Sequence, residues 1–422
     1  MLRNISHTFA FRTLSAVINL AIAVILSQYL GPAGKGSQSI ILTTISIILI
    51  FSNLVGGATL VYLVPRFKIS LLLAPSYAWS LVMGVLAYLL LVMTKLVAME
   101  FVVHICILSV INSFLSIHSN ILIGQQRIRE SNWLILLQSV ILVTSLLIAF
   151  WVLDPVSVKA YLDALYVSSL ICLIVSGILI RKSFPGLKLF PLNSLRPVVL
   201  EMFRYGFQNQ VAHITQLMSF RMSFYILEEY KGIGSVGIYS NGVSLAESIW
   251  LIAKSMALVQ YSWVSNSNDR EASARLSLQM VKAGMILSLL LIIPLLILPS
   301  KAYIFILGVG FEEVKSVIWT LVPGVVLYNM SILFGHYFSG TGRYYMNTRI
   351  SSAGFLISLA LYLYFIPRYD ILGAGIATSL SYVATSLLFL WFFAKEYRGW
   401  YKEVLPGVKD FRDLLALVKR KS

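Results

Sequence analysis

Four ionisable residues lie inside two consecutive apolar segments that are each long enough to cross a bilayer. His213 and Arg221 fall in the first segment, and Glu247 and Lys254 fall in the second. An ionisable side chain in mid-bilayer costs at least about 2.5–3.5 kcal/mol, so such residues usually face a protein interior or a water-filled cavity. Basic residues outnumber the single acid here, and an acid or an imidazole at that depth could carry a proton. The pattern predicts the wall of a transport pathway for an anionic cargo.

Each of these residues also has a structural explanation. Glu247 could pair with Arg221 or Lys254 as a tie inside the protein, and Arg221 could extend its guanidinium outward to the headgroups. A lone histidine such as His213 is often a hydrogen-bonded packing residue. Arg12, one turn into the first apolar segment, could line a cavity or reach the cytoplasmic headgroups. The sequence leaves both explanations open.

The composition indicates a helical membrane protein. Of 422 residues, 58% are hydrophobic and 12% are charged, which is more apolar surface than a soluble core of this size could hide. Apolar runs of about 20 residues, the length that spans a bilayer core, recur along the chain. Strands of a membrane barrel would instead alternate in polarity over about ten residues. We predict twelve spans: Phe9–Tyr29, Ser39–Val64, Leu71–Met93, Met99–Ile123, Trp133–Leu153, Ala160–Ile180, Tyr205–Leu227, Val236–Val264, Leu276–Pro299, Val314–Ser339, Thr348–Ile366 and Ile371–Ala394.

The basic residues predict the orientation. If the N-terminus is cytoplasmic, most of the 33 basic residues fall in inside connections, whereas Lys35 and Lys301 are among the few outside. Both termini are therefore expected in the cytoplasm. The formal charge of +16 does not indicate nucleic acid, because the basic residues lie between apolar runs and not on a soluble domain.

The longest internal connection divides the spans six and six. We predict an N-terminal six-helix lobe over residues 1–180, a basic cytoplasmic linker over 181–204 and a C-terminal six-helix lobe over 205–394. Because six is even, both lobes start on the same side, so any repeat is parallel. A trace of a repeat is the equal spacing of Tyr29, Gly31 and Gly36 after the first span and of Tyr230, Gly232 and Gly237 after the seventh.

The two ends of the chain each have a distinctive pattern. The first span resembles a signal peptide, but no clear cleavage site follows Tyr29, so we expect an uncleaved helix. The tail over 395–422 is basic, with apolar residues at helical spacing from Phe411 to Val418. It is predicted to be an amphipathic helix on anionic membrane lipids, with a solvated tail as the alternative.

Four phrases resemble the polysaccharide-biosynthesis (O-antigen or repeat-unit) flippases. They are Ser27-Gln-Tyr-Leu-Gly-Pro-Ala-Gly-Lys-Gly36, Val236-Gly-Ile-Tyr-Ser240, Gly340-Thr-Gly-Arg343 and Ile366-Pro-Arg-Tyr-Asp-Ile-Leu-Gly-Ala-Gly-Ile-Ala-Thr378. These flippases share a superfamily with the multidrug and toxic-compound extrusion (MATE) transporters. The resemblance implies an all-α, MATE-like membrane protein with about 12 transmembrane helices in two lobes related by a parallel pseudo-repeat. It implies that the chain moves a lipid-linked oligosaccharide, usually on undecaprenyl pyrophosphate, from the inner to the outer leaflet of the bacterial cytoplasmic membrane.

That task assigns roles to the polar residues. Arg12, Arg221, Lys254 and His213 are candidates to bind the pyrophosphate in a cationic cavity, and Glu247 and His213 are candidates to couple transport to an ion gradient. In the similar lipid II flippases, basic residues on helices one, two and eight line the cavity. The second span here carries no charge, which argues against lipid II. The candidates for sugar contact, which could instead only bridge helices, are Gln208, Asn209, Gln216, Tyr239, Asn241 and Trp250.

No motif in the sequence indicates catalysis, a cofactor or a metal. Gly232-Ile-Gly-Ser-Val-Gly237 spells a dinucleotide fingerprint, but it lies in a turn between membrane spans with no preceding strand. Cys106 and Cys172 fall inside predicted spans, without metal-ligand spacing. The chain is therefore predicted not to be an enzyme, and its expected partners are lipid-linked oligosaccharide, membrane lipids and polysaccharide polymerase and chain-length proteins.

Two other functions compete with this prediction. A drug antiporter of the MATE family would need buried acids for cationic drugs, and members of that family commonly place an acid in helix one or seven. Those spans here carry Arg12, His213 and Arg221. A membrane glycosyltransferase or polymerase would need a large outside loop with catalytic residues, and no such loop exists in the sequence.

Overall fold

Residues 2–152, 157–181, 192–267 and 269–397 are described by the computed structural model of the chain. Within these ranges the secondary structure is entirely helical, with thirteen helices and no strand. For residues 2–10, Arg12, Val152, residues 192–194, Gln208 and Asn209, the backbone alone is described. The predicted tail beyond Tyr397 lies outside the described residues.

Each predicted span falls largely within one helix or a pair of consecutive helices. In the first half they are α1 (Leu2–Gly56), α2 (Ala58–Leu63), α3 (Ile69–Thr94), α4 (Met99–Gly124), α5 (Ile128–Val152), α6 (Val158–Arg181) and α7 (Leu192–Lys231). In the second half they are α8 (Ile233–Glu247), α9 (Trp250–Asn266), α10 (Arg270–Ile297), α11 (Ser300–Leu307), α12 (Val314–Gly340) and α13 (Tyr344–Ala394).

The number of membrane crossings follows from these lengths. In the described part, eight helices are long and apolar enough to cross a membrane, and the pair α8 and α9, bent by 43°, makes a ninth. α1 and α13 each contain two predicted spans, joined at a sharp kink at Gly31 and at Asp370. α7 carries the charges discussed above and corresponds to the seventh predicted span. The prediction of about 12 spans in an all-α fold is confirmed.

Two glycines at the kinks after the first and seventh spans have the same backbone conformation. Gly31 has φ 64° and ψ −173°, and Gly232 has φ 80° and ψ 171°. This region of the Ramachandran plot is essentially restricted to glycine. The parallel repeat that the sequence hinted at is therefore present in the backbone of both halves.

A second repeated feature is the turn after the fourth and tenth spans. Gln126 and Gly342 both have positive φ. The next residue is an arginine whose N–H reaches back to a helix carbonyl, from Arg127 to Leu122 at 2.8 Å and from Arg343 to Phe338 at 2.7 Å. The two halves thus end their fourth helices in the same way.

The chain divides into two compact units, residues 1–214 and 215–422, with the boundary inside α7. The residues that we expected to be a linker are therefore partly helix, since α7 begins at Leu192. Val198 and Met202 are buried in a core of the first unit with Leu63. A Cβ added to Gly206 would lie 1.7 Å from the carbonyl oxygen of Leu54. The start of α7 belongs to the first lobe because it carries an apolar face that packs closely there.

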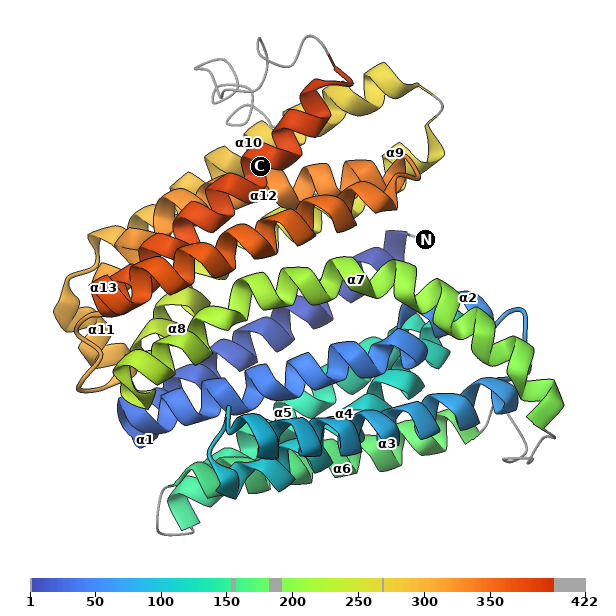
Figure 1. Cartoon of the computed structure of the whole chain (residues 1–422), viewed down its shortest axis with the longest axis horizontal. Coiled ribbons are helices and arrows are strands. Elements are labelled where there is room, and N and C mark those ends of the chain that lie inside the picture. Colours follow the sequence, from blue (N-terminus) through green and yellow to red (C-terminus); the bar gives the residue numbers. More distant parts are fainter. Residues whose placement is uncertain (1, 153–156, 182–191, 268, 398–422) are drawn as a thin grey trace. The chain divides into compact units, whose positions relative to one another are not determined.

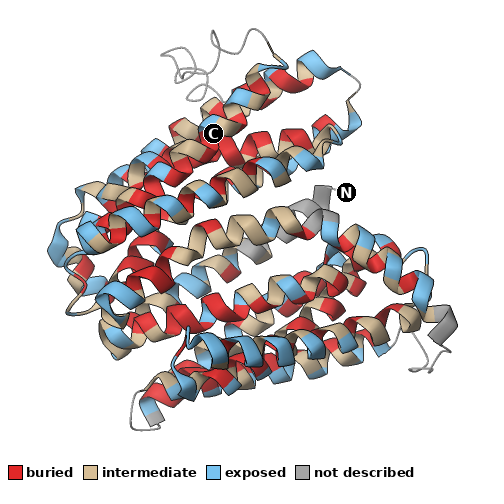
Figure 2. Cartoon of the chain, in the orientation of Figure 1, coloured by how far each residue is buried: buried red, intermediate tan, exposed pale blue. Residues whose placement is uncertain are grey.

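Each unit is built around its fourth helix. α4 contacts all the other helices from α1 to α6 in the first unit, and α12 contacts helices α8 to α11 and α13 in the second (Figure 1). The most apolar stretch of α12 is 72% buried, against 22% for that of the peripheral α3. Figure 2 colours the chain by burial. The exposed residues of α3 include several large apolar side chains, which suit contact with lipid.

Candidate functional site

Arg221 of α7 and Glu247 of α8 form an ion pair within the second unit. Arg221 Nη2 lies 3.0 Å from Glu247 Oε2, and Arg221 Nη1 donates to Glu247 Oε1 at 3.4 Å. The hydroxyl of Tyr382 on α13 donates to the same Oε1 at 2.7 Å. The side chains of Arg221 and Glu247 are 25% and 13% exposed, so the guanidinium is the more accessible partner.

Four aromatic rings pack around this pair. Phe220, Trp250, Tyr328 and Tyr382 contact one another in every combination, with ring centroids no more than 5.6 Å apart. We call these four residues the aromatic cluster. They come from α7, α9, α12 and α13, so the cluster joins four helices, and Tyr382 connects it to Glu247.

Lys254 lies on α9 at the edge of the aromatic cluster. Its Nζ is 6.0 Å from the centroid of the Trp250 ring, and the residue is exposed. No acidic side chain of the described residues lies within ion-pair distance of it. The chain bends between Glu247, which ends α8, and Trp250, which begins α9. Lys254 is therefore an exposed cation on a membrane-spanning segment.

His213 and Arg12 occupy equivalent places in the repeat. His213 precedes Gly232 by the same number of residues as Arg12 precedes Gly31. His213 is exposed and belongs to the first unit. Arg12 lies in α1, but its side chain is outside the described residues. The four predicted cations thus fall on both units.

Three candidates for sugar contact are buried in the second unit, and their role in binding a sugar stays a prediction. The Tyr239 hydroxyl lies 2.6 Å from Thr378 Oγ1, and Trp250 Nε1 donates to the Val325 carbonyl at 2.8 Å. Asn241 is 2% exposed. Their polar atoms stabilise helix packing, because a buried polar group in a membrane protein must find its partner within the protein.

The remaining amide candidates differ in position. Gln216 is half-buried, and its Nε2 donates to the Tyr328 hydroxyl at 2.9 Å, which connects it to the aromatic cluster. The side chains of Gln208 and Asn209 lie outside the described residues. Gln216 is thus placed at the aromatic cluster.

The structure adds polar residues that the sequence did not single out. Tyr382 and Tyr328 sit in apolar spans distant in sequence from Glu247, so no local spacing connects them to it. On α4, Asn112 and Ser116 are half-buried, and they contact Gln138 of α5 at 3.2 Å and Asn53 of α1 at 2.8 Å. These amide and hydroxyl groups form a polar face inside the first unit.

Lys35 differs from its predicted place in an outside connection. It lies in α1, is 3% exposed, and donates from Nζ to Gln38 Oε1 at 2.5 Å. Gln38 in turn donates to the Tyr161 hydroxyl of α6 at 3.4 Å. The kink at Gly31 returns the chain directly into the helix, so no loop remains for the lysine.

Among the described residues, no group of His, Cys, Asp or Glu could hold a metal ion.

The fold is that of known flippases and multidrug transporters. The lipid II flippase MurJ in an inward closed conformation superposes with a TM-score of 0.75 at 15% identity, over 96% of this chain and 88% of that one. An inward-facing multidrug resistance MATE transporter of the MOP superfamily gives 0.73 at 16% identity, over 89% and 93%. A MOP superfamily transporter from Pyrococcus furiosus, whose binding pocket of reverse polarity suggests a different function, gives 0.65 at 15% identity, over 94% and 95%. The chain is a multi-pass membrane protein with this fold.

The family follows from the sequence match. Residues 1–261 match the polysaccharide biosynthesis protein family, and the chain belongs to that family. An uncharacterized membrane protein of Methanocaldococcus jannaschii is 22% identical over 311 residues, which is 71% of this chain. The match spans 61% of that relative's length.

Proposed function

We propose that the chain translocates an oligosaccharide linked to undecaprenyl pyrophosphate from the inner to the outer leaflet by alternating access. The polysaccharide biosynthesis family and the flippase fold support a lipid-linked sugar as the cargo. Two compact units, each with its own core, suit a mechanism in which whole lobes move. The proposal places the chain in the bacterial inner membrane with both termini cytoplasmic, where a polymerase and a chain-length protein would receive its product.

The observation that carries the proposal is the balance of charge on the membrane-spanning segments. Glu247 is neutralised by Arg221, whereas Lys254 is exposed with no acidic partner among the described residues. An exposed cation in a membrane span is costly unless it faces water or an anion. Lys254 therefore favours a negatively charged cargo such as a pyrophosphate over a cationic drug.

We propose that half-buried polar side chains contact the sugar. Gln216 borders the aromatic cluster, and Asn112, Ser116 and Gln138 form the polar face of the first unit. Amide groups both donate and accept, which matches the hydroxyl groups of a sugar.

Coupling would run through Glu247. Protonation of its carboxylate would end the charge pairing with Arg221 and leave the guanidinium free for a phosphate oxygen. The groups that face Glu247 are Arg221 of α7 and Tyr382 of α13, with Tyr328 of α12 and Lys254 of α9 close to the aromatic cluster. Binding of an anion and uptake of a proton would then favour each other. The chain is proposed to act without covalent chemistry, as a transporter and not an enzyme.

The test is a leaflet-resolved assay in liposomes that contain a fluorescent lipid-linked oligosaccharide. Lys254→Ala and Arg221→Ala are each expected to slow translocation about tenfold or more, since a charge-assisted hydrogen bond contributes roughly 1.5–3 kcal/mol. Lys301→Ala, which removes an exposed lysine on α11, is the matched control and should translocate at the parent rate.

The same liposomes distinguish the alternative function. A cationic dye should not accumulate against a proton gradient if the cargo is anionic. Dye transport by the parent, together with no movement of the lipid-linked oligosaccharide, would instead identify a MATE-type drug antiporter.

A further inference from the structure

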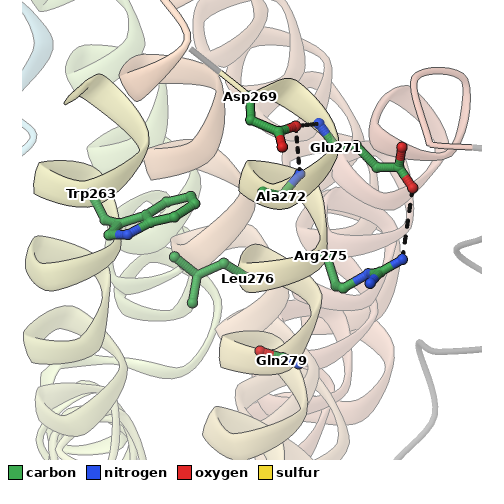
Figure 3. A pocket seen from close by; sticks show the side chains of 7 residues that line it. All are labelled: Trp263, Asp269, Glu271, Ala272, Arg275, Leu276 and Gln279. Carbon is green, nitrogen blue, oxygen red and sulfur yellow. Dashed lines mark hydrogen bonds and ion pairs between the residues drawn. The ribbon is translucent and has the colours of Figure 1, made fainter. Parts of the chain in front are cut away.

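Two cavities lie on either side of the first turn of α10. The smaller, about 360 Å³, lies between α9 and α10 and is lined by Trp263, Arg275 and Gln279 among others (Figure 3). The larger, about 570 Å³, is lined by Arg270, Glu271, Tyr337, Arg343, Glu396 and Tyr397. We call the larger one the α10 cavity. Neither belongs to the Arg221 site.

The α10 cavity lies where three membrane-crossing helices end. Arg270 is the first residue of α10, Arg343 follows the end of α12, and Glu396 follows the end of α13. Because all three helices are long and apolar enough to cross a bilayer, their shared end marks the level of the lipid headgroups. Trp263, 45% exposed beside the smaller cavity, fits this level, since tryptophan and tyrosine are enriched at the membrane interface.

One ion pair lines the α10 cavity. Arg343 pairs with Glu396, and its Nη2 also donates to Thr341 Oγ1 at 3.0 Å. The Tyr337 hydroxyl donates to Glu396 Oε2 at 3.3 Å. In the equivalent turn of the first unit, Arg127 donates to the Leu179 carbonyl at 3.1 Å and pairs with the adjacent Glu130. In the second unit, the acid that pairs with the arginine is Glu396, which follows α13 and lines the cavity.

Two charges at the rim of the cavity are open to a ligand. Arg270 is exposed and has no acidic partner within ion-pair distance among the described residues. Among the basic residues that the structure describes, Glu271 lies within ion-pair distance of Arg275, at 3.7 Å, and both side chains are more than half exposed. Such an exposed pair contributes little. The rim therefore offers one cation and one anion side by side.

We propose that the α10 cavity binds the headgroup of a zwitterionic phospholipid that carries a primary amine, as phosphatidylethanolamine does. Arg270 would hold the phosphate, and Glu271 and Glu396 would accept hydrogen bonds from the ammonium. A purely anionic headgroup would meet two carboxylates, and a choline headgroup has no N–H to donate. The mixed charge of the lining selects a ligand with both signs.

Native mass spectrometry of the full-length, delipidated protein tests this inference with phosphatidylethanolamine, phosphatidylcholine and phosphatidylglycerol of equal chain length. The parent should bind phosphatidylethanolamine about tenfold better than the other two lipids, because only that headgroup forms charge-assisted hydrogen bonds with both signs. Arg270→Ala and Glu271→Gln should each remove most of this preference. Arg349→Ala removes an exposed arginine at the same end of the lobe, outside the cavity, and should leave the preference intact.

Three outcomes would overturn the inference. The first is equal binding of all three lipids, and the second is a preference that survives both cavity substitutions. The third is a preference that appears only after residues 398–422 are deleted, which would make the chain's own tail the occupant. All variants should elute as monodisperse protein with the parent's thermal midpoint, so a loss of lipid binding cannot be attributed to misfolding.

Discussion

At the scale of single residues, Arg221 and Glu247 explain how charge is tolerated within a membrane span. Each partner supplies the counter-charge that lipid cannot, and Tyr382 occupies a further acceptor site of the carboxylate. Removing one partner of a buried pair leaves an uncompensated charge, which usually costs about 3–5 kcal/mol, and less where water reaches the group. The pair therefore has a structural role whether or not it also couples transport to protons.

Replacement of Glu247 should expose that structural role. We expect Glu247→Gln to lower the free energy of unfolding by about 2 kcal/mol, because Arg221 stays partly buried without its counter-charge. Tyr382→Phe, which removes one hydrogen bond to the carboxylate, should cost about 1 kcal/mol. Thermal unfolding of purified protein in detergent measures both, with the exposed Glu313→Gln as the control. Equal midpoints for Glu247→Gln and the control would contradict the ion pair.

At the scale of elements, interrupted helices set the architecture of each lobe. Gly31 and Gly232 reverse the chain after the first helix of each unit. The second helix of each unit is then broken, between α1 and α2 at Gly57 and between α8 and α9 after Glu247. The bend between α8 and α9 lies between Glu247, which pairs with Arg221, and Lys254, which is exposed.

Alanine at the two repeated glycines should destabilise the protein through the backbone alone. A Cβ at Gly31 or Gly232 would meet no atom within 4 Å, so the cost arises from the disallowed φ and ψ and should be about 1–3 kcal/mol at each site. Gly177→Ala in α6 also has open space around the new Cβ. It should be neutral or stabilising by up to about 1 kcal/mol, because alanine favours a helix. Chemical unfolding measures all three variants. If Gly177→Ala lowers the free energy of unfolding as much as Gly31→Ala and Gly232→Ala do, this explanation is wrong.

At the scale of the whole molecule, the repeat and the distribution of basic residues define the topology. Six spans in each half return the chain to its starting side, and both halves share the glycine kink, the turn before the arginine and a central fourth helix. In the topology that we propose, most basic residues lie on one side of the membrane. The positive-inside rule would place that side in the cytoplasm.

Cysteine labelling in intact cells can check this orientation. A membrane-impermeant maleimide should label Lys301→Cys in intact cells and Asn266→Cys only after permeabilisation, because exposed residues at these two positions are expected on opposite sides. The native thiols provide a low background, since Cys106 is 8% exposed and Cys172 is 1% exposed. Labelling of both variants in intact cells would reject the proposed topology.

The amino-acid sequence by itself determined the class of fold and the positions of the spans. Runs of about 20 apolar residues are a property of the local chain, since each helix satisfies its own backbone hydrogen bonds in lipid. The depth of Arg221, Glu247 and Lys254 followed from the same runs. The apolar runs did not predict the boundary of the first lobe, because the packing of Val198 and Met202 depends on helices that are distant in sequence.

Only the tertiary structure decided which polar side chains are available to a ligand. Lys254 and Trp250 are separated by one helical turn, yet one is exposed and the other is buried in the aromatic cluster. Tyr382 and Glu247 meet although they are far apart in the chain. Burial and pairing depend on which faces of several helices come together, and a periodicity that identifies a membrane span carries little information about those faces, since lipid and protein core are both apolar.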